Sequence, residues 1–169
     1  MEASYLFEIG DKIVYPMQGA GVIQGIEEKD FQGKKQQYYI IKMLTNNMEI
    51  MIPSWRMSNS NIRLISDDST LKNVLLNLNY KESEPIEPTE PLNSKQRYQI
   101  NMDKIKTGSL KDGAEVVYNL TQINKEKALN TSESQMLTNA RKFLIDEIIL
   151  IKKITEDEAN DLLDSIIDQ

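Results

Sequence analysis

The stretch VYPMQGAGVIQG, Val14–Gly25, decides how the first half of this chain folds, because it concentrates glycine and proline in a short span. Its GxGxxxG spacing allows two interpretations, a loop that holds phosphate or a structural turn. A phosphate loop needs glycines between a strand and the N-terminus of a helix, whose amides bind the anion. Here a second alternating segment follows, with Val22, Gln24 and Ile26 on one side, and no GK[ST] motif is present. The stretch is therefore predicted to be a tight turn and bulge where backbones approach closely.

The segments around this turn have the composition of short strands. They are Asp11–Pro16, Ala20–Phe31, Lys35–Leu44 and Met48–Pro53, which alternate or are rich in β-branched and aromatic residues. Turn signals separate them, because QGKK supplies a glycine suited to a left-handed position and TNN supplies asparagines that tolerate one. Short strands at a spacing of about ten residues predict a small antiparallel barrel or a strongly bent sheet.

The second half of the chain is predicted to be helical. Apolar residues recur at helical spacing in residues 67–80, 94–108, 109–128, 130–154 and 155–169. Capping residues mark several starts: Asp68 or Ser69, Ser109, Asn130, and Thr155 with Glu158. Gly108 is a helix stop. The proline- and glutamate-rich residues 81–94 are predicted to be a linker. The expected fold class is α+β, with a β module at 1–66, a helix and linker at 67–94 and a compact helical bundle at 95–169.

Composition excludes several kinds of function. The chain of 169 residues has no cysteine and no histidine, so it lacks thiolate chemistry and the commonest general base and metal ligand. We expect no enzyme, cofactor, metal or small-molecule substrate; a carboxylate-dependent hydrolase is the alternative that converging acids in a deep pocket would favour. No long apolar run and no signal peptide are apparent, so we expect a cytoplasmic protein without a membrane partner.

Some acidic and aromatic residues allow two interpretations. Asp67 and Asp68 could bind a metal, but their position at the start of a helix favours capping and a helix-dipole interaction. Trp55 is the only tryptophan. Burial in the core is the favoured interpretation, and exposure at an edge, where it would anchor a partner, is the alternative.

Two segments are candidates for binding surfaces. Residues 94–111 carry five basic residues and one acidic residue inside a chain of net charge −6, which is either an ordinary solvated face or a set of phosphate contacts. The strand MEIMIP, Met48–Pro53, is methionine-rich. It is either a barrel strand with a methionine-rich core or an edge strand that pairs with a partner strand.

The order of several segments resembles the CarD/CdnL family of bacterial transcription regulators. IGDKIVYPMQGAGVIQGIE, QYYIIKML, MEIMIP and NIRLI are similar to its N-terminal module, which also occurs in transcription–repair coupling factors. RYQINMDKIKTGS, AEVVYNL and MLTNARKFLIDEI continue the resemblance through the C-terminal half. The resemblance implies a Tudor-like module that docks on the β subunit of RNA polymerase. It also implies a helical domain that touches promoter DNA at the upstream edge of the −10 region.

The resemblance also implies the site residues. The polymerase-facing candidates are Met51 and Pro53 in IMIP, with Lys29 on a preceding strand and Ile40 or Ile41 on the neighbouring strand. The DNA-facing candidates are Ser94, Lys95, Arg97, Lys104 and Arg141.

The chain departs from the family pattern at the DNA-facing segment. Where the family commonly has a tryptophan that wedges into the minor groove, the chain has Ser94, and Gln96 replaces a basic residue. We therefore expect a non-catalytic regulator that binds RNA polymerase and affects the stability of the open promoter complex, with weakened DNA contact. The alternative is an adaptor that binds only protein, without promoter contact. A basic face around Arg97 and Arg141 would favour DNA contact, and a neutral or acidic face would favour the adaptor.

Overall fold

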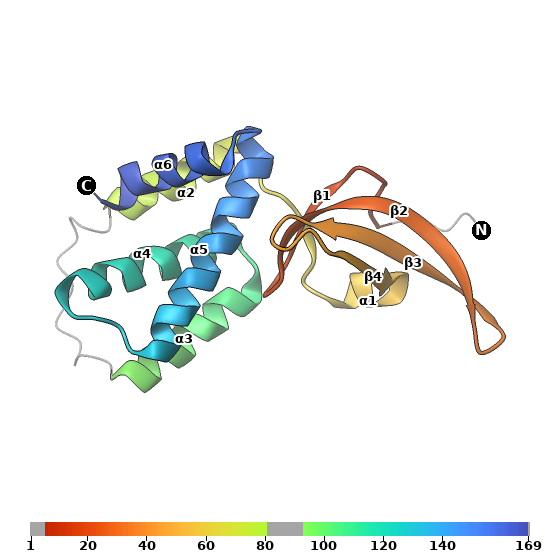
Figure 1. Cartoon of the computed structure of the whole chain (residues 1–169), viewed down its shortest axis with the longest axis horizontal. Coiled ribbons are helices and arrows are strands. Elements are labelled where there is room, and N and C mark those ends of the chain that lie inside the picture. Colours follow the sequence, from red (N-terminus) through yellow and green to blue (C-terminus); the bar gives the residue numbers. More distant parts are fainter. Residues whose placement is uncertain (1–5, 81–92, 169) are drawn as a thin grey trace.

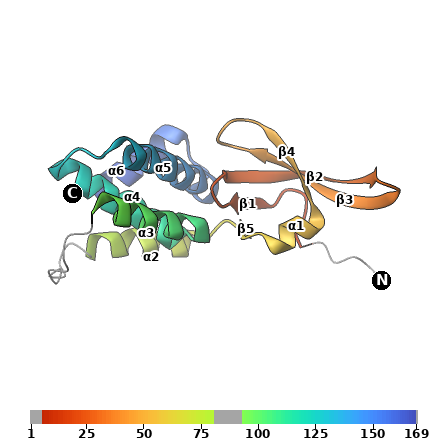
Figure 2. The ribbon, with the colours of Figure 1, turned by 90° about the horizontal axis from the view of Figure 1, so that it is seen from below.

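The structure, a computed structural model, describes residues 6–80 and 93–168. A β module formed by the first part of the chain lies beside a helical domain, and Figures 1 and 2 show the two parts meeting end to end. The predicted linker lies mostly outside the described residues. The expected α+β class, with a strand-rich N-terminal half and a helical C-terminal half, is confirmed.

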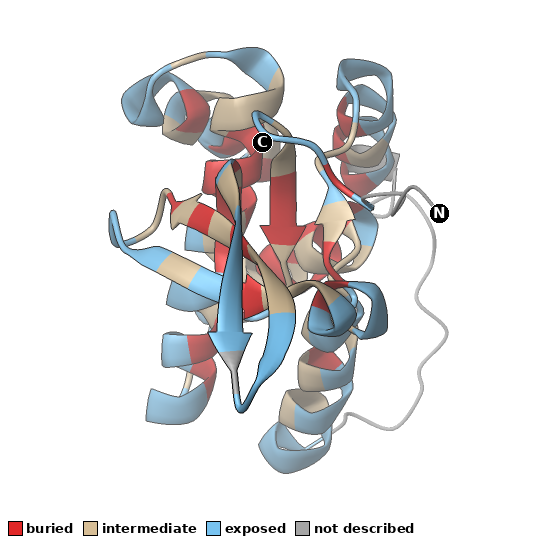
Figure 3. Cartoon of the chain, turned by 90° about the vertical axis from the view of Figure 1, so that its right-hand side faces the viewer, coloured by how far each residue is buried: buried red, intermediate tan, exposed pale blue. Residues whose placement is uncertain are grey.

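The β module is one antiparallel sheet in the order β4-β3-β2-β1-β5. Its strands are β1 Lys12–Tyr15, β2 Gly19–Phe31, β3 Lys34–Met43, β4 Glu49–Pro53 and β5 Arg63–Leu64. The first four match the segments predicted from alternation. The sequence pattern does not predict β5 or the short helix α1, Ser54–Asn59, because each is too short to show periodicity. Residues 27–30 and 32–35, toward the end of the long β2–β3 hairpin, are exposed, as Figure 3 shows.

The glycines of the opening stretch have the structural roles predicted for them. A turn joins β1 to β2, with the Gln18 N–H donating to the Tyr15 carbonyl at 2.9 Å. The register of β2 against β3 shifts between Ile23 and Gly25, which is the predicted bulge. A Cβ atom on Gly21 would lie 2.7 Å from the Lys42 carbonyl oxygen, so the two backbones approach too closely for a side chain. A strand, and not a helix, follows these glycines.

The β module has its own hydrophobic core. Alternate residues of the strands point inward and pack with Met57 of α1, because side chains of a strand alternate between its two faces. The buried members are Phe7, Ile13, Ile23, Tyr39, Ile41, Met43, Ile52, Met57 and Ile62. The opposite face of the sheet is thus left for other contacts.

The helical domain contains five of the helices: α2 Asp68–Tyr80, α3 Ser94–Thr107, α4 Leu110–Glu126, α5 Thr131–Lys152 and α6 Glu156–Ile167. The predicted caps at Ser109 and Asn130, the capping box of Thr155 with Glu158 and the left-handed stop at Gly108 are confirmed. The predicted helix α2 is present, but its predicted cap at Asp68 or Ser69 is wrong, because the Asp67 carboxylate accepts the Thr70 N–H at 2.7 Å and so provides the cap.

A second, larger core holds the helices together. It contains apolar residues from α2, α4, α5 and α6, so α2 packs with the C-terminal helices although it directly follows the β module in the chain. Leu71 and Leu78 of α2 are almost fully buried beside Val117 of α4 and Ile148 of α5. Partly buried residues of α3 also pack against this core, so it fixes the positions of the N-terminal ends of α3 and α5.

Candidate functional site

The outer face of the sheet carries most of the predicted polymerase-facing residues. Met51 on β4 lies directly opposite Ile40 on β3, and Pro53 lies opposite Tyr38. Lys29 on β2 pairs with Gln36, which is on the same side of β3 as Ile40 because its position differs by an even number. The structure therefore places Lys29, Ile40, Met51 and Pro53 on one face, which we call the outer face.

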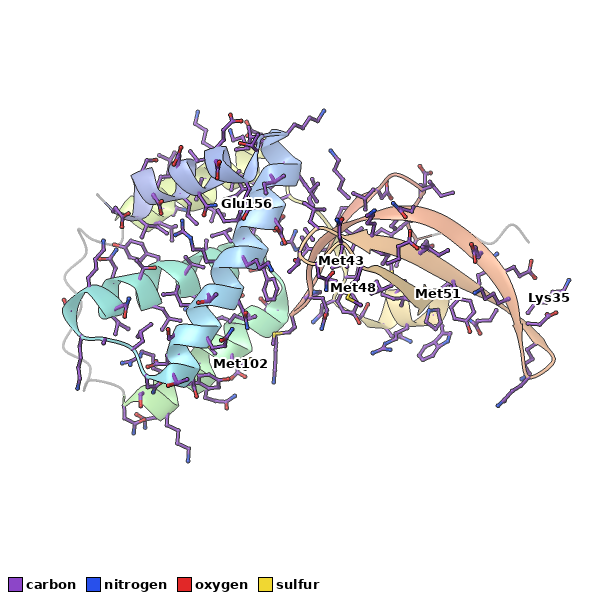
Figure 4. All side chains as sticks on the ribbon, in the orientation of Figure 1. Lys35, Met43, Met48, Met51, Met102 and Glu156 are labelled. Atoms are coloured by element: carbon purple, nitrogen blue, oxygen red, sulfur yellow. The ribbon has the colours of Figure 1, made fainter. Side chains whose placement is uncertain are left out.

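Strand β4 is one edge of the sheet, so within the described residues its second side pairs with no other strand. Met51 is 43% exposed, and Met48, just before the strand, is exposed as well. Figure 4 shows both side chains at this part of the module. An edge with free backbone groups and apolar side chains beside it can accept a partner strand. The interpretation of MEIMIP as a strand with a methionine-rich core does not hold for Met48 and Met51.

Ile41 is not part of this face. It is fully buried in the core of the β module, where it lies opposite Ile50 of β4. Adjacent residues on a strand point to opposite sides, so Ile40 and Ile41 cannot both reach the outer face. Of the two alternatives left open by the sequence, only Ile40 is available to a partner.

Trp55 is a further exposed apolar residue close to β4 in the sequence. Its side chain belongs to α1, two residues after the strand ends, and it is 57% exposed. The expectation that Trp55 is buried is wrong, because Met57 occupies the core-facing side of this short helix. Residues two apart on a helix point in nearly opposite directions, so the burial of one exposes the other. We call Met48, Met51 and Trp55 together the edge patch.

The DNA-facing candidates are divided between exposed residues and residues held in ion pairs. Ser94 and Lys95 are exposed at the first turn of α3. Arg97, by contrast, makes a bidentate ion pair with Glu133 of α5, with Nη2 at 2.7 Å from the carboxylate. The Glu133 side chain is only 1% exposed, and its hydrogen bonds raise the pKa of Arg97. Arg97 is thus engaged inside the domain.

The other two basic candidates also have acidic partners. Lys104 contacts Glu115 of α4 at 3.2 Å. Arg141 donates to Asp164 of α6 at 2.7 Å and to Asn160 at 3.1 Å. Arg97 and Arg141 are thus both paired with carboxylates of the same domain, so of the two alternatives for the face around them the structure is closer to a neutral face than to a basic one.

The Arg97–Glu133 pair joins the first turns of α3 and α5. Their N-terminal ends lie close together at the lower side of the helical domain in Figure 1. The N-terminus of a helix carries a partial positive charge and amides that are not bonded within the helix. A groove of about 380 Å³ runs beside this end. Its lining includes Tyr98, Met102, Gln135 and Phe143, and none of its lining side chains is charged.

Asp67 and Asp68, for which the sequence favours capping over a metal site, both have structural partners. Asp67 caps α2, and its hydrogen bonds with Thr70 lower the pKa of the Asp67 carboxyl. Asp68 contacts Lys152 at 2.6 Å. Among the residues that the structure describes, no three acidic side chains converge in a way that could hold a metal ion. Across the same residues, every helix is too short or too polar to cross a membrane.

Comparison with known proteins finds matches to both halves of the chain. Residues 7–66 match the family described as the CarD-like/TRCF RID domain, and residues 78–164 match the family described as the CarD C-terminal domain. The "Putative transcription factor YdeB" of Bacillus subtilis (strain 168) is 52% identical over 151 residues, which is 89% of this chain and 95% of that protein. A solved structure titled "CdnLNt from Myxoccoccus xanthus" is 43% identical, with a TM-score of 0.29 over 34% of this chain and 79% of that one.

Proposed function

The chain belongs to the CarD family of transcription factors, and from this premise we propose that it docks on the β subunit of RNA polymerase through β4 and influences the stability of the open promoter complex. Binding of RNA polymerase is general to this family. The observation that carries the proposal is the pairing of exposed Met51 with Ile40 at the unpaired edge of the sheet. The factor would act in the bacterial cytoplasm, at the nucleoid through its polymerase.

A factor of this kind acts by differential affinity. If it binds the open complex more tightly than the closed complex, the equilibrium shifts by the ratio of the two affinities. Docking on polymerase alone changes nothing unless a second contact differs between the two states. The ends of α3 and α5, with exposed Ser94 and Lys95, are the part of the helical domain that we assign to promoter DNA at the upstream edge of the −10 region.

The DNA contact is expected to be weak. A phosphate that recruits Arg97, Lys104 or Arg141 has to compete with a carboxylate that each already contacts. Each phosphate contact that is not made removes one release of counterions and with it affinity. Ser94 offers no apolar wedge for an unstacked base step.

A second candidate is an adaptor that docks on polymerase without touching DNA. The ion pairs of Arg97 and Arg141 favour it, because they bring the face around these two residues close to neutral. Under this hypothesis any effect on transcription comes from another protein bound to the factor. The edge patch has the same role in both candidates.

The docking proposal is tested by capture of the polymerase β lobe with Met51→Glu. A charge placed against an apolar partner surface should weaken binding by at least about tenfold. Leu76→Glu is the matched control, because Leu76 is an equally exposed apolar residue on α2 of the helical domain. Equal binding by the parent and Met51→Glu, or no binding by the parent, would contradict the proposal.

The DNA contact is tested by comparing Ser94→Trp with the parent on a forked promoter bound to polymerase. If weak contact is correct, the tryptophan variant prolongs the lifetime of the open complex relative to the parent. The increase in lifetime that the parent adds to that of polymerase alone should also depend little on salt, since the factor itself contacts few phosphates. If neither protein changes the lifetime, the adaptor hypothesis is favoured. If the parent already equals the tryptophan variant, the argument from Ser94 is wrong.

A further inference from the structure

Arg63 of β5 and Glu147 of α5 connect the β module to the helical domain. The Arg63 guanidinium donates two hydrogen bonds to the Glu147 carboxylate, at 2.9 and 2.7 Å. The Ser66 N–H donates to the same carboxylate at 2.9 Å, and Arg63 Nε donates to the Gly108 carbonyl at 2.8 Å. The Glu147 side chain is 4% exposed, so this charge is satisfied almost entirely by the β5 segment.

The preceding residue of α5 makes a separate contact. The Thr45 hydroxyl, just after β3, donates a short hydrogen bond to the Asp146 carboxylate. Adjacent residues on a helix point about 100° apart, so Asp146 and Glu147 reach different elements of the β module. One helix thus holds the sheet at β5 and again at the β3–β4 connection.

The turn of the opening stretch forms a third contact. A Cβ atom on Gly108 would lie 2.5 Å from Pro16, and one on Gly19 would lie 2.5 Å from the Thr45 hydroxyl and 3.3 Å from Phe143. The space left between the two parts at this turn is a cavity of only about 50 Å³. Contacts at three separate points oppose rotation about an axis through any one of them.

We propose that Arg63, Asp146 and Glu147 are positioning residues that hold the β module and the helical domain as one rigid unit. Under the proposed function, docking of β4 on polymerase then fixes where the ends of α3 and α5 lie relative to the promoter. Met48 and Met51 lie on one side of the contact in Figure 4, and the N-terminal ends of α3 and α5 lie on the other side in Figure 1. If the angle between the β module and the helical domain is fixed, docking of β4 on polymerase also sets the position and orientation of the ends of α3 and α5 at the DNA.

The choice of charged residues supports a positioning role. Apolar side chains of similar volume often stabilise a buried contact as well as an ion pair does, because they avoid desolvation of two charges. A bidentate pair, in contrast, accepts only one relative orientation of its two planes. Domains of one chain move relative to each other by default unless the interface between them is large and apolar, so directional contacts such as these favour a fixed angle.

The rigid unit is tested by measuring a distance between spin labels on the full chain. The chain has no cysteine, so Lys35→Cys in the β2–β3 hairpin and Asp157→Cys in α6 give two unique attachment sites, both exposed. The parent should give one narrow distance distribution. Glu147→Gln and the double variant Arg63→Met/Glu147→Met should broaden it at least about twofold, with the thermal unfolding of the double variant retained. A broad distribution in the parent, or an unchanged one in the double variant, overturns the proposal.

The control is a second buried ion pair that lies within one domain. Arg97→Met/Glu133→Met removes the pair between α3 and α5 and should leave the label distance unchanged. Equal broadening in this control would show a general loosening and would also overturn the proposal.

A functional measurement separates this inference from the proposed function. The Arg63→Met/Glu147→Met variant should bind the polymerase β lobe as the parent does and lose the effect of the parent on open-complex lifetime. Full retention of that effect with a broadened distance overturns the link between rigidity and promoter contact. If the parent fails to bind polymerase, the proposed function fails, and the label distances still decide whether the unit is rigid.

Discussion

Arg97 of α3 and Glu133 of α5 form an ion pair in which the Glu133 side chain is 1% exposed and the Arg97 side chain is 25% exposed. The two residues are 36 positions apart in the chain. Their contact fixes the relative position of two helix ends that we assign to promoter DNA. Arg97, a candidate for phosphate binding, is thus a structural residue that neutralises the buried Glu133.

The stability of the helical domain should depend on Arg97. Replacing Arg97 by alanine leaves the Glu133 charge buried without its main partner, so the free energy of unfolding should fall by about 3 kcal/mol. Urea denaturation measures it. Lys95→Ala, an exposed residue on the same turn, should change it by less than about 0.5 kcal/mol. Similar small losses in both variants would show that Arg97 is free to bind DNA.

Gly108 should be far less replaceable than Gly33, although both have a positive φ. Gly33→Ala has open space around the new methyl group, so it should lose only about 1 kcal/mol of unfolding free energy. Gly108→Ala adds a clash with Pro16 across the domain contact, and a loss of about 3 kcal/mol is expected. Thermal unfolding of the two variants compares them directly, and equal losses would contradict the tight approach at Pro16.

Acidic pH should act on Asp146 in the direction opposite to that of most carboxylates. Burial raises the pKa of Asp146, and nearby Glu156 adds to this, although the Thr45 hydrogen bond and Lys142 lower the pKa. The folded state therefore binds this proton more tightly than the unfolded state. Its contribution to stability is fully present below the ordinary Asp value, about 4, and is lost as pH rises through the higher folded value.

Asp146→Asn tests this sign. Asparagine can still accept the Thr45 hydrogen bond but cannot carry the charge. The variant should gain stability relative to the parent as pH rises from about 3 to 7, measured by urea denaturation at each pH. A relative loss over the same range would mean that ionised Asp146 stabilises the fold.

Local signals allowed much of the fold to be predicted. The left-handed Gly33 and Gly108, and the caps at Ser109 and Thr155, depend on residues three or four positions apart, so a sequence window contains their whole cause. The alternation that identified β4 also fixes Met51 and Ile50 on opposite faces, though it could not decide which face would be covered.

The partners of the charged residues could not be predicted in the same way. Arg63 and Glu147 are 84 positions apart and meet only because β5 and α5 pack against each other. The basic segment 94–111 likewise leaves phosphate contact and a solvated face open, and nothing in the sequence indicates the carboxylates that contact Arg97 and Lys104 in the fold. Trp55 was misplaced for a related reason, since a helix of six residues gives too few positions to show which side is buried.

Substitutions of Trp55 and Met57, both in the short helix α1, should have different effects: one on polymerase binding and the other on stability. Met57 is fully buried in the core of the β module, so Met57→Ala should cost about 2–5 kcal/mol of unfolding free energy. Trp55→Ala should cost less than about 0.5 kcal/mol, because the side chain is mostly exposed.

If the edge patch is the docking surface, Trp55→Ala should nevertheless weaken capture of the polymerase β lobe by about tenfold or more, as expected of an exposed aromatic anchor. Urea denaturation and a binding titration on the same preparations measure both quantities. If Trp55→Ala binds polymerase with the affinity of the parent, the docking surface is limited to β4 itself. If Trp55→Ala instead loses much of its unfolding free energy, Trp55 contributes to the core of the β module.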